Sequence, residues 1–486
     1  MKRGRNSNSE SRQGRFLVGV ATTLIVLSVA ACSVASRSPS PEPAATAPAS
    51  GEAVSPSPAP DTPAPSDSGA PTSPASSPTP SPLPSLGAVP AGTWTGFDWI
   101  SLPAGHGPSL PAATDLAGPE VNLRGWSRGY VEIVWDPHLR TITPWVSGDG
   151  LTWNAGDNLD TTDWSAEFQA YDAQHSGPGD HDACYLSVSE FDEGGATLLM
   201  RAFFSCAGGC GEPWYTSQSA MWTSSDALGW IPVDVRGTFG AGGVGSISGG
   251  SSGFIALGSS MSSKILWLSA DGRQWTNGTL PADLRKATSS VGSPASFAGG
   301  YVLPGVLLQK AGEEYSGGGA GCVAPEGPSN PPVYRAALWS STDGKNWVRD
   351  SLTGTTDAAS VTMSVIRVDD HTLIAVQNAY VPDVRGVTSA EWVSTDGKAW
   401  KPLEGVSPYA TALTDGTRGL LIGCNDPANP AQDVWLNACA IGPNLQAVHL
   451  TESGEMPQSV DGQLALGPTG LLLTGDGTNF WIGVPR

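Results

Sequence analysis

The stretch Trp267-Leu-Ser269-Ala-Asp271-Gly-Arg-Gln-Trp275 decides the fold of this chain, because its pattern occurs five times. Each copy places Ser two residues before Asp, one Trp four residues before the Asp and another Trp four residues after it. The copies are Trp145–Trp153, Trp222–Trp230, Trp267–Trp275, Trp339–Trp347 and Trp392–Trp400. A pattern that returns this often predicts one supersecondary unit repeated along the chain.

The physics of the motif is that of a hairpin turn. A strand ends at Ser, the Asp carboxylate turns back onto the backbone N–H groups that follow it, and Gly accepts a positive φ in four of the five copies. The two tryptophans then lie on paired strands, where each can bury a large apolar face. We therefore expect structural roles, not catalytic or calcium-binding ones, for Ser147, Asp149, Ser224, Asp226, Ser269, Asp271, Ser341, Asp343, Ser394 and Asp396.

This motif resembles the Asp-box, also called the bacterial neuraminidase repeat. The Asp-box is found in sialidases, some other glycoside hydrolases, sortilin-type receptors and photosystem assembly factors, where it joins the two outer strands of a propeller blade. The resemblance covers most of the chain from Trp94 to the C-terminus. It implies an all-β propeller with Asp-box hairpins, and it implies little about function.

A second repeat gives the number of blades. A turn followed by a short apolar strand occurs seven times, beginning at Gly129, Ala196, Gly253, Gly300, His371, Gly419 and Gly470. The first five precede the five boxes, and the sixth precedes a decayed box around Trp435. The seventh unit ends before a fourth strand, and Trp94–Leu102 has the character of a last strand without earlier ones.

Pairing of the N- and C-terminal strands would close such a ring and leave no open sheet edge. We predict a seven-bladed β-propeller closed in this way. Six or eight blades are alternatives, because long inserts before Trp222 and Trp339 could hide or mimic strands. Kelch-like repeats, suggested by two double glycines, and a tandem of β-sandwiches are weaker alternatives.

The first 91 residues predict export and anchoring. Residues 1–31 have a basic start, an apolar run and small residues, which is the order of a signal peptide. Val29-Ala30-Ala31-Cys32 resembles the lipobox of bacterial lipoproteins, which implies cleavage before Cys32 and a diacylglycerol on its sulfur. Alternatives are an ordinary signal peptide with a chance cysteine, or an uncleaved anchor. We expect a lipoprotein on the outer side of the bacterial cytoplasmic membrane or on the cell surface.

Two segments follow the signal peptide. Residues 32–91 contain the cysteine and a Pro/Ser/Ala-rich stretch with hardly any residue to bury, which predicts a disordered linker. Residues 92–486 form the propeller domain. The formal net charge of -20 argues against a nucleic-acid partner.

Six cysteines besides Cys32 suggest disulfides outside the cytoplasm. Cys424 and Cys439 flank a polar loop between two neighbouring strands and are the best pair. The connectivity of Cys184, Cys206, Cys210 and Cys322 stays open. The spacing of Cys206 and Cys210 could suggest a metal knuckle, but no histidine or second close cysteine pair accompanies it, so we expect no metal.

Enzyme signatures are scarce in the chain. It contains no Gly-x-Ser-x-Gly elbow, no His-Glu-x-x-His helix and no phosphate-binding glycine loop, and we expect no catalytic residue and no cofactor. Asp180-His181-Asp182 is typical of a solvated turn. Resemblance to sialidases would imply three convergent arginines, a Tyr/Glu nucleophile pair and an acidic proton donor, yet the family's Arg-Ile-Pro segment is absent.

The sequence therefore favours a monomeric, non-catalytic propeller that binds a protein or glycan ligand, or scaffolds envelope components, through loops at one end of the ring. Residues 206–217 and 312–332 are candidate recognition loops, or else disulfide-braced decoration. A glycoside hydrolase of the exo-sialidase-like class is the alternative, and an assembly factor for another envelope protein is a third class.

Overall fold

The computed structural model describes residues 94–103, 105–110, 120–136, 141–161, 183–207, 215–216, 219–240, 243–258, 264–286, 288–313, 330–381, 386–424, 437–454, 463–475 and 479–486. The chain divides into two compact units, Met1–Leu24 with Leu83–Arg486 and Ile25–Pro82. All described residues belong to the first unit. The predictions for Cys32, for the linker and for the decayed box at Trp435 lie outside the described residues.

The described strands form seven sheets of four or five strands, which we number as blades 1 to 7. Blade 1 contains β2 (Glu120–Trp126), β3 (Gly129–Asp136), β4 (Thr141–Ser147) and β5 (Asn154–Ala155). Blade 2 contains β6 (Ala183–Gly194), β7 (Thr197–Ala207), β8 (Tyr215–Thr216), β9 (Ala220–Ser224) and β10 (Ile231–Val233). Blade 3 contains β11 (Val244–Gly250), β12 (Gly253–Gly258), β13 (Leu266–Ser269) and β14 (Thr276–Asn277).

Blade 4 contains β15 (Ser290–Val291), β16 (Ala295–Phe297), β17 (Gly300–Lys310), β18 (Val333–Ser341) and β19 (Val348–Arg349). Blade 5 contains β20 (Ser360–Arg367), β21 (Leu373–Val381), β22 (Gly386–Ser394) and β23 (Lys401–Pro402). Blade 6 contains β24 (Val406–Thr414), β25 (Gly419–Cys424), β26 (Ala438–Ile441) and β27 (Ala447–His449). Blade 7 contains β1 (Gly96–Ser101), β28 (Thr451–Gly454), β29 (Gln463–Gly467), β30 (Gly470–Thr474) and β31 (Phe480–Pro485).

The first strands of the blades form the inner ring. β2 contacts β6, β6 contacts β11, β11 contacts β16, β16 contacts β20, β20 contacts β24, β24 contacts β29, and β29 returns to β2. Outward from this ring, neighbouring strands pair antiparallel, except that β28 pairs parallel with β1 at the outer edge of blade 7. The chain is therefore a seven-bladed β-propeller, and the predicted blade count is confirmed.

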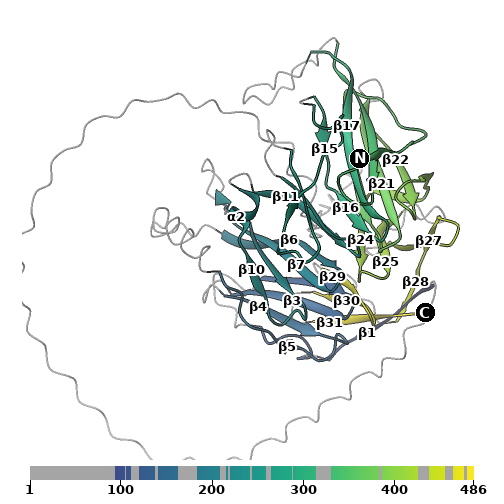
Figure 1. Cartoon of the computed structure of the whole chain (residues 1–486). Coiled ribbons are helices and arrows are strands. Elements are labelled where there is room, and N and C mark those ends of the chain that lie inside the picture. Colours follow the sequence, from purple (N-terminus) through teal and green to yellow (C-terminus); the bar gives the residue numbers. More distant parts are fainter. Residues whose placement is uncertain are drawn as a thin grey trace, which may run out of the picture. The chain divides into compact units, whose positions relative to one another are not determined.

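Blade 7 is completed by the two ends of the folded chain. β1 pairs antiparallel with β31, from Phe97 opposite Pro485 to Ser101 opposite Trp481, and it pairs parallel with β28 on its other edge (Figure 1). The backbone N–H of Arg486 also donates to the carbonyl of Gly96 at 2.9 Å. The predicted closure by N- and C-terminal strands is confirmed, and its physical reason is that a paired edge exposes no unsatisfied backbone groups.

The core lies between neighbouring blades, and the tryptophans of the motif supply much of it. Trp222 packs with residues of blades 1 and 2, Trp339 with residues of blades 3 and 4, and Trp392 with residues of blades 4 and 5. One described helix, α2 (Val235–Phe239), connects blade 2 to blade 3, and its Phe239 ring lies 5.0 Å from that of Trp267. Each blade thus buries its apolar face only against its neighbours, as in other repeat folds.

The ring has two chemically different ends. The first strand of each blade turns into the second at the same end where the third turns into the fourth, so the Trp-Ser-Asp motifs share one end with the inner hairpin turns. The hydroxyl of Thr469, in an inner turn, donates to the carbonyl of Asp149 at 3.2 Å and joins the two kinds of turn. We call this the turn end, and we call the opposite end, where second strands finish and third strands begin, the open end.

Candidate binding face

The five Trp-Ser-Asp motifs have one common geometry. In the copy at Asp271, the Oδ1 atom accepts from the N–H of Arg273 at 2.9 Å and of Gln274 at 2.8 Å, and the hydroxyl oxygen of Ser269 accepts from the N–H of Gly272 at 2.8 Å. The carboxylates of Asp149, Asp226, Asp343 and Asp396 accept the two equivalent N–H groups. These carboxylates are already used within their own turns.

The electrostatics of these turns agree with that use. The backbone N–H of Gly229 holds the pKa of Asp226 below its ordinary value, and that of Asn346 does the same for Asp343. At Asp271 and Asp396 burial is the largest single influence and acts to raise the pKa, but the hydrogen-bond donors together outweigh it. A carboxylate held ionised by several donors is a poor general acid.

Ala227 takes the position of the turn glycine in the second copy. Its φ is 63°, close to the values of 79°, 71°, 66° and 66° at the glycines of the other four copies. The turn therefore imposes the left-handed conformation even on a residue that disfavours it.

An ion pair crosses the centre of the ring near the turn end. Arg367, the last residue of β20 in blade 5, donates to Asp192 of β6 in blade 2 at 3.1 Å. The two side chains are 7% and 21% exposed. Burial raises the pKa of Asp192 to about 6, although Arg367 acts to lower it. Next to this pair, the carboxylate of Glu193 accepts from the hydroxyl of Ser127 at 2.7 Å. The pair links two blades that are not neighbours in the ring.

One buried carboxyl group departs from the repeat. Glu132 on β3 lies opposite Trp145, at the position that Met200, Ala256, Leu303 and Ala375 take opposite the first Trp of the other four motifs. Its side chain is fully buried, and neither carboxyl oxygen has a hydrogen-bond partner among the described residues. Burial raises its pKa to about 8. The carboxyl group is not exposed to solvent in this structure.

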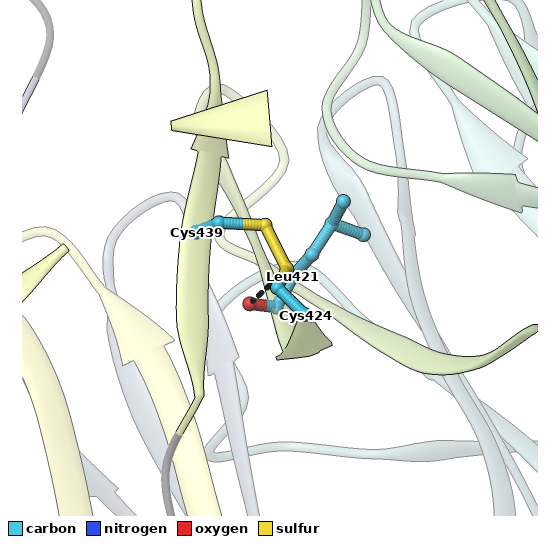
Figure 2. The surroundings of a disulfide bond; sticks show 3 residues. All are labelled: Leu421, Cys424 and Cys439. Carbon is cyan, nitrogen blue, oxygen red and sulfur yellow. Dashed lines mark hydrogen bonds between the residues drawn. A yellow bond between two sulfur atoms is a disulfide. The ribbon is translucent and has the colours of Figure 1, made fainter. Parts of the chain in front are cut away.

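The structure joins Cys424 and Cys439 by a disulfide, across β25 and β26 (Figure 2). The Sγ atom of Cys424 also lies 3.8 Å from the carbonyl oxygen of Leu421. Both cysteines are buried in the core between blades 5 and 6. Of the other four cysteines, Cys184 and Cys206 are register partners on β6 and β7, and Cys210 and Cys322 lie outside the described residues.

Five arginines of the described residues bind partners within the fold. Arg201 pairs with Glu190, Arg335 with Asp357, and Arg418 with Asp415. Arg124 donates to the carbonyls of Leu123 and Val188, and Arg367 holds Asp192 as described above. In the part of the chain that the structure describes, these five arginines lie on five different blades, and each has its own partner.

The open end carries the most exposed aromatic side chain of the described core strands. The register of β24 against β25 shifts between Val406 and Thr411, which leaves the residues between them as a bulge. Tyr409 is in this bulge and is 74% exposed. The backbone N–H of Tyr409 donates to the hydroxyl of Ser407 at 3.2 Å, which orders the bulge locally. Bulges of this kind commonly redirect a side chain near a binding site.

Blade 5 adds to the same face. Tyr380, near the end of β21, is 47% exposed, and Val387, opposite it on β22, is 59% exposed. Strands of blade 5 contact β24 of blade 6, so the two blades are neighbours. Two tyrosines and a valine thus lie exposed on adjacent blades at the open end. No sequence pattern pointed to them, because their exposure depends on where each blade stops.

Metal sites, membrane-spanning helices and the candidate loops can be assessed only for the residues that the structure describes. No group of three or more His, Cys, Asp or Glu side chains is placed to hold a metal ion within the described ranges. No helix in those ranges is long and apolar enough to cross a membrane. The Asp180-His181-Asp182 turn lies outside the described residues, as do most of the two candidate recognition loops.

Comparisons with known proteins concern the fold alone. No family model matches the chain, and no curated protein sequence does. Among solved structures, it is similar to a polysaccharide lyase named as a PL25 ulvan lyase (12% identity, TM-score 0.26), covering 68% of this chain and 66% of the lyase. It therefore spans slightly less than two thirds of that enzyme.

Two further similar structures are glycoside hydrolases. They are the GH32 β-fructofuranosidase of Bombyx mori (11% identity, 75% of this chain and 88% of that one, TM-score 0.25) and the GH62 α-L-arabinofuranosidase catalytic domain of Coprinopsis cinerea (11%, 81% and 98%, TM-score 0.23). Such identities and TM-scores carry no argument about catalytic residues or substrates.

Proposed function

We propose that this protein is a surface lipoprotein whose propeller binds a protein or glycan ligand through its open end, without catalysing a reaction. The observation that carries the proposal is the exposed Tyr409, displayed by a bulge on an innermost strand. Tyrosine offers a large, rigid surface with a polar tip at a small entropic cost, and it is enriched where proteins bind ligands. The turn end offers less, because its carboxylates are used inside the fold.

The proposal includes the anchor at Cys32 and the linker of residues 33–91, which would hold the propeller away from the membrane. Cys32→Ser removes the thiol that accepts the lipid. The variant should leave the membrane fraction or accumulate as precursor, and it should take up no labelled palmitate. Equal labelling of the variant and the unaltered protein would contradict lipidation at Cys32.

A glycoside hydrolase is the second candidate, and the similar structures named above belong to that class or are lyases. Most glycoside hydrolases act with two carboxyl groups that flank the scissile bond. Glu391 is the only carboxyl group among the residues of β20, β21 and β22 and its Oε1 atom is buried, while the exposed Glu404 lies beyond them in the connection to blade 6. The geometry of the described residues thus favours binding over hydrolysis.

One experiment separates these functions. The full-length protein is tested for binding to a glycan array and to purified envelope proteins, and for release of reducing sugar from fructan, arabinan and sialosides. We expect binding that Tyr409→Ala weakens and that Val348→Ala, at an exposed valine of the turn end, leaves intact. Reducing-sugar release that is lost on Glu391→Gln would establish the hydrolase instead. Binding that Tyr409→Ala and Val348→Ala affect equally would refute the assignment of the open end.

A further inference from the structure

Within the described residues, blade 5 continues further toward the open end than blade 6 does. β21 has nine residues and its counterpart β25 has six, although both follow the inner hairpin turn of their blade. Along β21, Ile374 and Val376 belong to the core between blades 5 and 6. Asn378 and Tyr380 continue the same face of the strand, because side chains alternate with a period of two. They extend past the apolar core, and Tyr380 is exposed.

The neighbouring strands repeat this pattern in register. Tyr380 lies between Ser360 on β20 and Val387 on β22, and Asn378 lies between Thr362 and Ser389 on the same two strands. We call these six residues the blade 5 flank. Ser360, Thr362, Tyr380, Val387 and Ser389 are exposed, and Asn378 is half-buried. The opposite face of β21 is packed instead, since Ala375 and Ala379 lie in the core between blades 4 and 5.

Glu391 lies at the end of the flank that is nearest the apolar core between blades 5 and 6. It is two residues beyond Ser389 on β22 and lies opposite Val376. Its Oε1 atom is buried and has no hydrogen-bond partner among the described residues. Burial raises the pKa of Glu391, while a hydrogen bond with the Ser389 side chain acts to lower it. A carboxyl group at this position disfavours a ligand of negative charge.

The chemistry of the flank selects a class of ligand. It combines one aromatic ring with hydroxyl and amide groups that both donate and accept hydrogen bonds. None of its six residues is an arginine or a lysine, so these residues supply no cationic group to bind carboxylate, sulfate or phosphate. The net charge of -20 likewise disfavours an anionic polymer. A sugar chain without charged groups matches this surface, because its rings have apolar faces and hydroxyl edges.

We propose that the blade 5 flank is a binding subsite for an uncharged polysaccharide, with a sugar ring stacked on Tyr380 and its hydroxyls bonded to Asn378, Thr362 and Ser389. This inference rests on the proposed function, for which it names the ligand class and the position. The subsite lies on regular strands, which hold side chains in place more precisely than loops do.

The test measures retardation of the full-length protein in native gels that contain soluble glucan, mannan, arabinan or, as the anionic comparison, polygalacturonate. At least one neutral polymer should retard the protein. Tyr380→Ala and Asn378→Ala should each weaken that affinity about tenfold or more, as expected for a central interface residue. Tyr380→Phe keeps the ring and should retain most of the affinity. Val348→Ala, at the turn end, should match the unaltered protein.

Three results would overturn the inference. Retardation of Tyr380→Ala and Asn378→Ala by neutral polymers as strong as that of the unaltered protein would refute the subsite on the flank and leave binding elsewhere on the open end intact. Retardation by polygalacturonate alone would reverse the ligand class. Retardation by none of the polymers would exclude polysaccharide, while the proposed function would still stand on the protein arm of its own experiment.

Discussion

Glu132 provides the sharpest test of how the blades pack, because its carboxyl group has no hydrogen-bond partner among the described residues and stands where four other blades have an apolar side chain. Its pKa is about 8 in the folded protein against an ordinary 4.5. Below pH 4.5 the carboxyl group is protonated in both the folded and the unfolded chain. Between pH 4.5 and 8 only the folded chain keeps the proton, so the free energy of unfolding falls as the pH rises.

The size of this loss follows from the difference between the two pKa values. Each pKa unit corresponds to about 1.4 kcal/mol, so the full loss above pH 8 is about 3 to 5 kcal/mol. Glu132→Gln keeps the shape and removes the ionisation. The stability of this variant relative to the unaltered protein should therefore rise by that amount between pH 4.5 and pH 8.5.

The assay is urea unfolding of the full-length protein, followed by tryptophan fluorescence at both pH values. The stability difference between the variant and the unaltered protein is the quantity of interest, because Asp192 and Asp350 also have raised pKa values. Glu404→Gln, at an exposed glutamate, is the control and should show no pH-dependent difference. A Glu132→Gln difference that is equal at the two pH values would refute the reasoning.

Three further predictions concern the turn, the axis and the closure. Asp271→Ala should lower the free energy of unfolding by about 1 to 3 kcal/mol, since it removes two hydrogen bonds of about 0.5 to 1.5 kcal/mol each, and an unchanged urea midpoint would contradict a structural role. Arg367→Met should lower the free energy of unfolding by about 3 to 5 kcal/mol, because it leaves the Asp192 carboxylate without its counter-charge, and adding Asp192→Asn should restore much of that stability. A double-mutant cycle without coupling between the two residues would count against the axial pair. Deletion of residues 93–102 removes β1 and should destabilise the entire ring, so a melting temperature equal to that of the full chain would argue against closure.

The fold was largely predictable because its signals are local and repeated. All seven predicted second strands are present, and the hairpin turns follow from Ser, Asp and Gly at fixed spacing. The closing strand was predictable because the last predicted blade lacked a fourth strand, and the strand at Trp94–Leu102 had no preceding strands with which to form a blade. Register repeats of this kind need no information from distant parts of the chain.

The candidate site was not predictable in the same way. The Arg367–Asp192 pair joins residues 175 positions apart, with no local pattern at either one. The unusual position of Glu132 could be recognised only from the strand register, which aligns it with Met200 and Ala256 in other blades. Tyr380 and Tyr409 look like ordinary strand residues in the sequence, and their exposure arises from the unequal lengths of two blades and from a bulge.

Hydrogen exchange in the presence of a bound ligand tests the central claim most directly, because it locates the ligand on the ring. The full-length protein is compared with and without a saturating amount of whichever array glycan or envelope protein it binds. Binding at the open end predicts slower exchange in residues 376–381, 386–391 and 406–411, with the five Trp-Ser-Asp turns unchanged. Protection confined to those turns, with no change in blades 5 and 6, would contradict the account.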